Sequence, residues 1–282
     1  LTFVSRMLRR HADVVSVTGG NGYWTGADEM ATVFEPALTP RLRLAGRLTR
    51  TDPHHPKYTQ PRSWSYAADD LIDKYYLTER HATKDDKDAI ERVIRLTLFR
   101  FGRGKTARFV DKSQVYTVRT RFLQELLREY KPYFALITRD PYATCYRAAT
   151  GKAGDIARYS AFMDFDARFR LCIEHWHNAM RTVLTDAPHL ERFAIYKFED
   201  FLIRPEITAR RLCEFLQVEF NADMLPSEAH RIPFGTRYSR RWYPLNAMVN
   251  RRYLETITPE QVQRVYGRCG ELARELGYDR PK

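Results

Sequence analysis

The sequence contains no apolar run that approaches the roughly 20 residues a membrane-spanning helix needs, and no signal peptide opens it. Its four cysteines show neither the close spacing of a zinc site nor the density of a disulfide framework. His175 and His177 lie two residues apart on a predicted helix, so they point to different faces and cannot share a metal ion. These absences predict a chain with no membrane span and no metal. Its thiols are expected to be reduced, which favours the cytoplasm.

The balance of charge is strongly positive. The 282 residues carry a formal net charge of +12 at pH 7, which indicates an anionic partner and says little about the fold. Nucleic acid, a nucleotide cofactor and an acidic polysaccharide all remain open on charge alone.

Short β-prone segments alternate with longer helical patterns. Strands are predicted over 14–17, 108–111, 134–138 and 193–196, and helices over 1–10, 66–77, 84–101, 116–129, 162–185 and 259–276. This alternation predicts a three-layer α/β fold, with a mostly parallel sheet flanked by helices. We expect a single domain over 1–282, in which the proline-rich, charged segment 39–62 is an irregular insertion and a candidate lid on the acceptor side.

The segment 134–150 carries the clearest functional signal. An apolar strand ends at Arg139, after which Asp140 can cap a new helix and Pro141 suits its first turn. The carboxyl end of a parallel strand is where ligands bind, and a helix N-terminus favours anions. Arg139 is therefore predicted to hold a phosphate; the alternative is a surface arginine that pairs with Asp140.

Lys112 occupies the corresponding position after the strand 108–111. We expect it to face the same crevice as Arg139, where a cation can stabilise a transferring or leaving oxyanion. The alternative is a solvated surface lysine.

Two glycine-containing segments resemble phosphate-binding loops only weakly. Residues 102–106 match the tail of a P-loop, but Phe99 stands where the first glycine belongs, and a helix precedes the segment where a strand should. A helix end and turn are the simpler interpretation. Residues 19–22 lack the spacing of a dinucleotide-binding loop and are predicted to form an ordinary loop.

A basic and aromatic segment, 235–245, can clasp a nucleotide or form a flexible loop. Asp28, Glu29 and Glu35 follow the first predicted strand. Each can deprotonate an acceptor hydroxyl or can simply place a negative charge at a helix N-terminus.

Taken in order, these segments resemble the sulfotransferases that use 3′-phosphoadenylyl sulfate (PAPS). Members of that family carry a strand ending in Lys and a later strand ending in Arg-Asp-Pro, here at Lys112 and at Arg139 to Pro141. The segment 196–201 is similar to the family's Tyr-x-x-Glu-Asp-Leu segment, with a helix like 206–216 after it. The closing Leu-Gly-Tyr-Asp, 276–279, looks like the family's as well.

The resemblance implies roles for particular residues. Arg139 would bind the 3′-phosphate of the donor, and Lys112 would lie near the sulfuryl group. Arg147 stands where the family usually has a serine that shares this phosphate, so Arg147 or Thr144 would substitute for it. Three further residues are implied to lie at the nucleotide, namely Tyr196, Arg237 and Arg241.

The implied reaction is in-line transfer of a sulfuryl group from PAPS to a hydroxyl or amine, with a glycan or a small molecule as acceptor. Glu29 is the first choice for the general base, and no metal is required if Lys and Arg supply the positive field. The family's 5′-phosphosulfate loop comes just before a helix like 1–10, and it is not in this sequence. We therefore expect a chain truncated at its N-terminus, with half a cofactor site, which puts its own activity in doubt.

Two other functions are alternatives. A P-loop-like small-molecule kinase would need an intact phosphate loop and an acidic magnesium ligand. A nucleic-acid-binding module would need a basic stripe with exposed aromatic residues, whereas here Lys and Arg are spread along helices.

Overall fold

The computed structural model describes residues 2–17, 19–20, 29–43, 65–104, 106–152, 163–226 and 245–281. The strands are β1 (Val14–Ser16), β2 (Gly19–Gly20), β3 (Arg108–Phe109), β4 (Phe134–Thr138) and β5 (Phe193–Lys197). The helices are α1 (Thr2–Leu8), α2 (Met30–Val33), α3 (Ile72–Tyr75), α4 (Lys84–Phe101), α5 (Thr120–Leu126), α6 (Pro141–Arg147), α7 (Phe165–Asp186), α8 (Phe198–Ile203), α9 (Pro205–Leu216), α10 (Arg251–Leu254) and α11 (Pro259–Glu275).

The α/β class with parallel strands is confirmed, but the described strands pair in two small sheets and not in one. β1 pairs in parallel with β3, and β2 lies antiparallel on the other edge of β1. β4 and β5 pair in parallel along their whole length, from Phe134 opposite Phe193 to Thr138 opposite Lys197. Residues 19 and 20, predicted to be in a loop, instead form the short strand β2.

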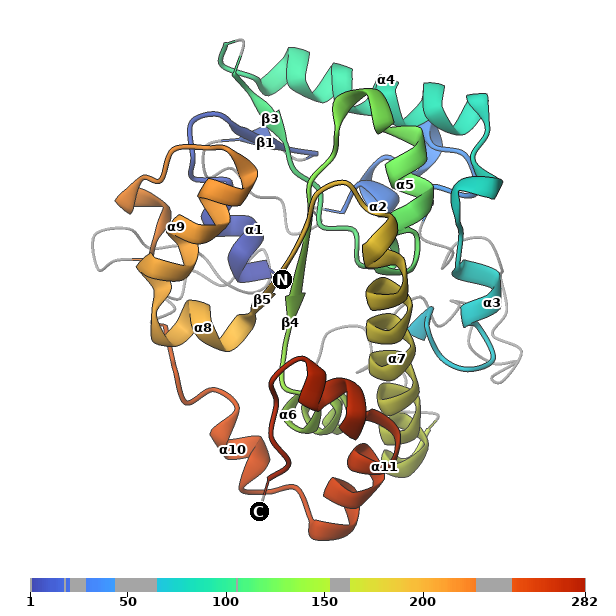
Figure 1. Cartoon of the computed structure of the whole chain (residues 1–282), viewed down its shortest axis with the longest axis vertical. Coiled ribbons are helices and arrows are strands. Elements are labelled where there is room, and N and C mark those ends of the chain that lie inside the picture. The colour runs from blue at the N-terminus through green and yellow to red at the C-terminus, as the bar shows by residue number, and fades with distance from the viewer. Residues whose placement is uncertain are drawn as a thin grey trace.

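Side chains on the two faces of the strands pack into two different hydrophobic cores. In β4, Leu136 belongs to one core, while Ala135 and Ile137 pack against the other. The first core includes residues of α5, α7 and α11, and the second includes residues of α1, α8 and α9. Figure 1 shows α1, α8 and α9 on one side of β4 and β5, with α5 and α7 on the other. Helices therefore cover both faces of the strands, as in the predicted three-layer arrangement.

Local capping signals explain the best-predicted helices. The capping box of α11 is present: the Thr258 hydroxyl accepts from the Gln261 backbone N–H, and the Gln261 side chain accepts from the Thr258 N–H. Gly277 follows this helix with a φ of 74°, a conformation that favours glycine. α4 begins after its cap, Thr83, and covers the predicted range 84–101.

The predicted helix over 116–129 is wrong as a continuous element. A 3₁₀ turn, Gln114–Val118, leads to α5, and a second 3₁₀ turn follows α5. Arg119 lies at the first break. Its buried guanidinium donates to the carbonyl oxygens of Tyr75, Arg41 and Arg43, so a tertiary contact fixes the backbone there.

The predicted helix over 66–77 shortens to α3. Most of the predicted insertion 39–62 lies outside the described residues. Its first part, 39–43, packs against the fold, and Leu42 is fully buried.

None of the helices in the described ranges is both long enough and apolar enough to cross a lipid bilayer.

We predict that Phe201→Ala lowers the free energy of unfolding by about 3–5 kcal/mol. Phe201 is fully buried in the second core and packs edge to face on Phe3, with ring centroids 6.3 Å apart. Urea unfolding measures the loss. Ile203→Ala is the control, since Ile203 lies on the same helix but is 60% exposed, and it should cost less than about 0.5 kcal/mol. Equal losses in the two variants would contradict the assignment of α8 to the second core.

Candidate functional site

Arg139 lies between the end of β4 and the start of α6. The helix begins here because the Asp140 carboxylate accepts from the Ala143 N–H at 2.8 Å and Pro141 occupies the first helical position. The Arg139 guanidinium is partly buried over the ring of Phe198, 5.1 Å from its centroid. Its Nε and Nη2 donate to Asn250 Oδ1 at 3.0 and 2.6 Å. Arg139 is thus held by Asn250, while Asp140 serves as a helix cap.

A carboxylate from α8 anchors this site. Glu199 Oε1 accepts from the backbone N–H of Asp140 at 3.1 Å and from Asn250 Nδ2 at 2.6 Å. Its other oxygen accepts from the Tyr278 hydroxyl at 3.1 Å. Sequence reasoning assigned no role to Glu199, Asn250 or Tyr278. Glu199 and Tyr278 do lie in the two segments that carry the family resemblance, but nothing in the sequence singles out Asn250.

Positive charges gather at α6. Burial lowers the pKa of Arg139, and the nearby charge of Arg147 lowers it further. The two guanidinium groups therefore repel each other, and an anion between them would relieve this repulsion. Thr144 lies on the same helix, and its buried hydroxyl has no hydrogen-bond partner among the described residues.

Tyr196 lies in a different environment. Its ring packs in the second core against Phe201, and its hydroxyl donates to the carbonyl of Arg211 at 3.1 Å. Arg237 and Arg241 fall outside the described residues, as does Asp28.

The residues after β3 hold a second polar cluster in place. Asp111 Oδ1 accepts from the N–H of Met30 at 2.7 Å, and the Ser113 hydroxyl accepts from that of Ala31 at 3.0 Å. The segment that follows β3 therefore caps α2, although some 80 residues separate the two in the chain. This capping brings Lys112 beside Glu29, which occupies the N-cap position of α2.

Glu29 and Lys112 form a mostly buried ion pair. Lys112 Nζ lies 3.4 Å from Glu29 Oε1, and the side chains are 11% and 17% exposed, respectively. Gln114 Nε2 donates to the same oxygen at 3.2 Å. Burial raises the pKa of Glu29; Lys112 opposes this effect, and Asp111 adds to it. A carboxylate with a raised pKa beside a cation can accept a proton from a hydroxyl group. Glu35 begins a separate 3₁₀ turn, Glu35–Ala37.

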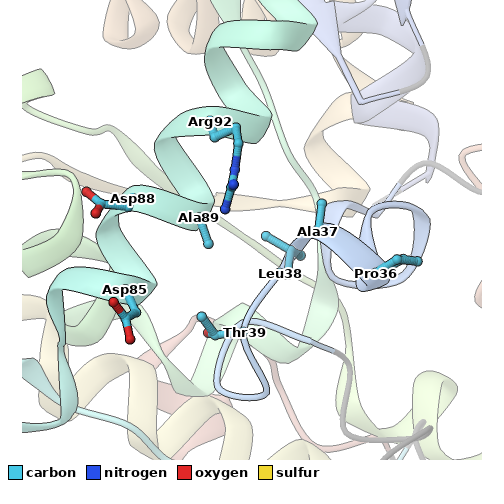
Figure 2. Close-up of a pocket in the computed structure, with 8 residues that line it drawn as sticks. All are labelled: Pro36, Ala37, Leu38, Thr39, Asp85, Asp88, Ala89 and Arg92. Carbon is cyan, nitrogen blue, oxygen red and sulfur yellow. The ribbon is translucent and has the colours of Figure 1, made fainter.

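A hollow of about 580 Å³ opens between α4 and the segment that follows α2. Figure 2 shows Asp85, Asp88 and Arg92 on the α4 side of the hollow and residues 36–39 on the other side. Of the predicted catalytic and cofactor-binding residues that the structure describes, none lines this hollow.

In the described part of the chain, no three histidines, cysteines or carboxylates gather closely enough to hold a metal ion. All four cysteines are buried free thiols.

Comparison with known protein families identifies the family of the chain. Residues 2–222 match the sulfotransferase family, and no curated protein matches the chain. Several solved structures resemble it, three sulfotransferases among them. A sulfotransferase domain from the curacin biosynthetic pathway is 16% identical, with 69% of each chain covered and a TM-score of 0.48. A sulfotransferase domain from the Synechococcus PCC 7002 olefin synthase is 18% identical, over 69% of this chain and 65% of that one, with a TM-score of 0.47. Sulfotransferase STF9 from Mycobacterium avium is 13% identical, over 99% of this chain and 74% of that one, with a TM-score of 0.49.

We predict that the free energy of unfolding of the wild type rises, relative to that of the Asp140→Asn variant, as the pH falls from 7 to 4. Burial, with the charge of Glu199 as a smaller cause, raises the pKa of Asp140 from 3.8 to about 6. Between these values the folded protein binds a proton that the unfolded chain does not, so acid favours the folded state. The relative gain should be about 2–3 kcal/mol.

Asparagine is the matched variant because its oxygen can still cap α6. Urea unfolding of both proteins at pH 7 and pH 4 measures the effect. A stability difference that does not change with pH would contradict the prediction.

Proposed function

The chain belongs to the sulfotransferase family, and we propose that it takes the sulfuryl group from PAPS and passes it to a hydroxyl or amine of an acceptor. The acceptor class we propose is a glycan or a small molecule. For the setting we propose the cytoplasm, because all four cysteines are buried thiols.

The observation that carries the proposal is the guanidinium of Arg139 at the junction of β4 and α6. Within the described residues its Nη1 makes no hydrogen bond, since Asn250 engages only Nε and Nη2. The Nη1 side of the guanidinium therefore remains available to a phosphate oxygen. The planar guanidinium of arginine matches the geometry of phosphate oxygens well.

The neighbouring residues also fit a 3′-phosphate. A dianion would offset the repulsion between Arg139 and Arg147, and the buried hydroxyl of Thr144 could donate to it. Arg237 and Arg241 remain predictions for the same nucleotide. For Tyr196 the packing of its ring in the core favours a role in supporting β5.

The reactive end of the site would lie at Glu29 and Lys112. When bound, PAPS supplies an activated sulfuryl group. Glu29 would accept the proton that the acceptor hydroxyl loses, and burial, which raises its pKa, makes it a stronger base than an exposed glutamate. Lys112 would counter the negative charge on the peripheral oxygens, because such transfers depend on positioning and cationic stabilisation.

We predict that Arg139→Ala weakens the binding of 3′,5′-adenosine bisphosphate to the full-length protein by about 10- to 100-fold, the loss expected for a charge-assisted hydrogen bond. Isothermal titration calorimetry measures the dissociation constant. Arg204→Ala is the matched control, because its side chain is 66% exposed and, among the described residues, makes only a 4.0 Å ion pair with Asp200. Unchanged affinity in Arg139→Ala would remove the central assignment.

Glu29→Gln should lower kcat by about 10²- to 10⁴-fold, the usual contribution of a general base, with little change in the KM for PAPS. The wild-type rate should rise with pH as Glu29 loses its proton, and the variant should lack this rise. Release of the bisphosphate from PAPS, with a panel of hydroxyl-bearing glycans and small molecules, measures turnover. Glu35→Gln is the comparison: a full loss in that variant, with Glu29→Gln active, would transfer the role of base to Glu35.

A further inference from the structure

Asn250 lies between a cation and an anion. Its side chain is buried, just before α10, and α10 packs against α6. On one side its Oδ1 accepts two hydrogen bonds from Arg139, at 3.0 and 2.6 Å. On the other side its Nδ2 donates to Glu199 Oε1 at 2.6 Å.

The chemistry of the two neighbours determines the orientation of this amide. A guanidinium can only donate hydrogen bonds, and a carboxylate can only accept them. The amide oxygen must therefore face Arg139, and the amide nitrogen must face Glu199. A neutral amide satisfies both groups at once, whereas an aspartate would repel Glu199 and an alanine would satisfy neither.

Glu199 is itself firmly placed. It accepts from the backbone of Asp140 and from the Tyr278 hydroxyl, and that hydroxyl lies 2.8 Å from the hydroxyl of Thr138. The carboxylate is thus tied to the end of β4, one residue from Arg139. Without an intervening group, Arg139 could pair directly with Glu199.

A direct ion pair would harm a phosphate site in two ways. It would offset the positive charge of Arg139, and it would occupy N–H groups that a phosphate needs. The amide prevents this pairing while it holds the Nε side of the guanidinium, and Nη1 stays without a hydrogen bond among the described residues.

We propose that Asn250 is a positioning residue that separates Glu199 from Arg139 and so keeps the charge of Arg139 available for the 3′-phosphate of the nucleotide. This inference rests on the proposed function, because it assumes that Arg139 binds that phosphate.

The test is the ratio of two dissociation constants, that for adenosine 5′-monophosphate over that for 3′,5′-adenosine bisphosphate. The two ligands differ only in the 3′-phosphate, so the ratio reports on that group alone. It should be well above one in the full-length wild type and about 10- to 100-fold lower in Arg139→Ala.

Two single substitutions should lower this ratio by about tenfold or more. Asn250→Asp places a carboxylate on Arg139, and Asn250→Ala lets Arg139 pair with Glu199. Asn246→Asp is the control for the first, since it adds the same charge to the same segment and should leave the ratio unchanged. The affinity for the monophosphate and the unfolding temperature show that each variant is folded.

The decisive variant is the double substitution Asn250→Ala with Glu199→Gln. A neutral glutamine cannot neutralise Arg139, so the second change should restore most of the ratio that the first one lost. A purely structural role for Asn250 predicts the opposite, because removing another member of the network would weaken the site further.

The possible failures are distinguishable. If Arg139→Ala lowers the ratio but both Asn250 variants keep it, or if the double variant is no better than Asn250→Ala, the separating role of Asn250 is overturned and the proposed function stands. If the wild type does not distinguish the two nucleotides, or if Arg139→Ala keeps the ratio, the proposed function fails and the inference fails with it.

Discussion

The carboxylate of Glu199 joins three parts of the chain that lie far apart in sequence. It accepts hydrogen bonds from the backbone at the end of β4, from the residue that precedes α10, and from a tyrosine in the C-terminal tail. The position of Arg139 depends on this anchor, because Asn250 reaches the guanidinium from the same carboxylate. A partly buried carboxylate with three donors is well satisfied, so Glu199 can hold Arg139 in place through Asn250 without pairing with it.

The same arrangement of a helix cap beside a cation occurs around Arg139 and around Lys112. Asp140 caps α6 and Arg139 directly precedes it; Asp111 and Ser113 cap α2 and Lys112 lies between them. In each case the capping side chain is a sequence neighbour of a cation that follows a strand, directly at Arg139 and three residues after β3 at Lys112. Two cores, one on each face, hold the strands in place. Because the caps also hold the helices that follow, the backbone on both sides of each cation is restricted. The chemistry proposed here depends on such positioning more than on reactive groups.

Local interactions explain where the predictions succeeded. β4 and α4 have the predicted bounds, and the capping box at Thr258 is present, because strand periodicity and helix caps involve residues within a few positions of one another. The helix predicted over 116–129 failed for the opposite reason. Arg119 binds carbonyl groups more than 40 residues away, and this contact interrupts a pattern that is helical by itself.

Short-range patterns were enough to predict the α/β class, Arg139 directly after β4 and the cap that starts α6. The strand predicted over 108–111 is shorter, since β3 ends at Phe109 and Lys112 lies three residues beyond it. Which side chains meet depends on the tertiary fold. Glu29 lies 83 residues from Lys112, Asn250 lies 111 residues from Arg139, and Tyr278 lies 79 residues from Glu199. No local pattern encodes these pairs, because packing of the two cores brings them together. The amide between Arg139 and Glu199 is therefore visible only in the folded chain.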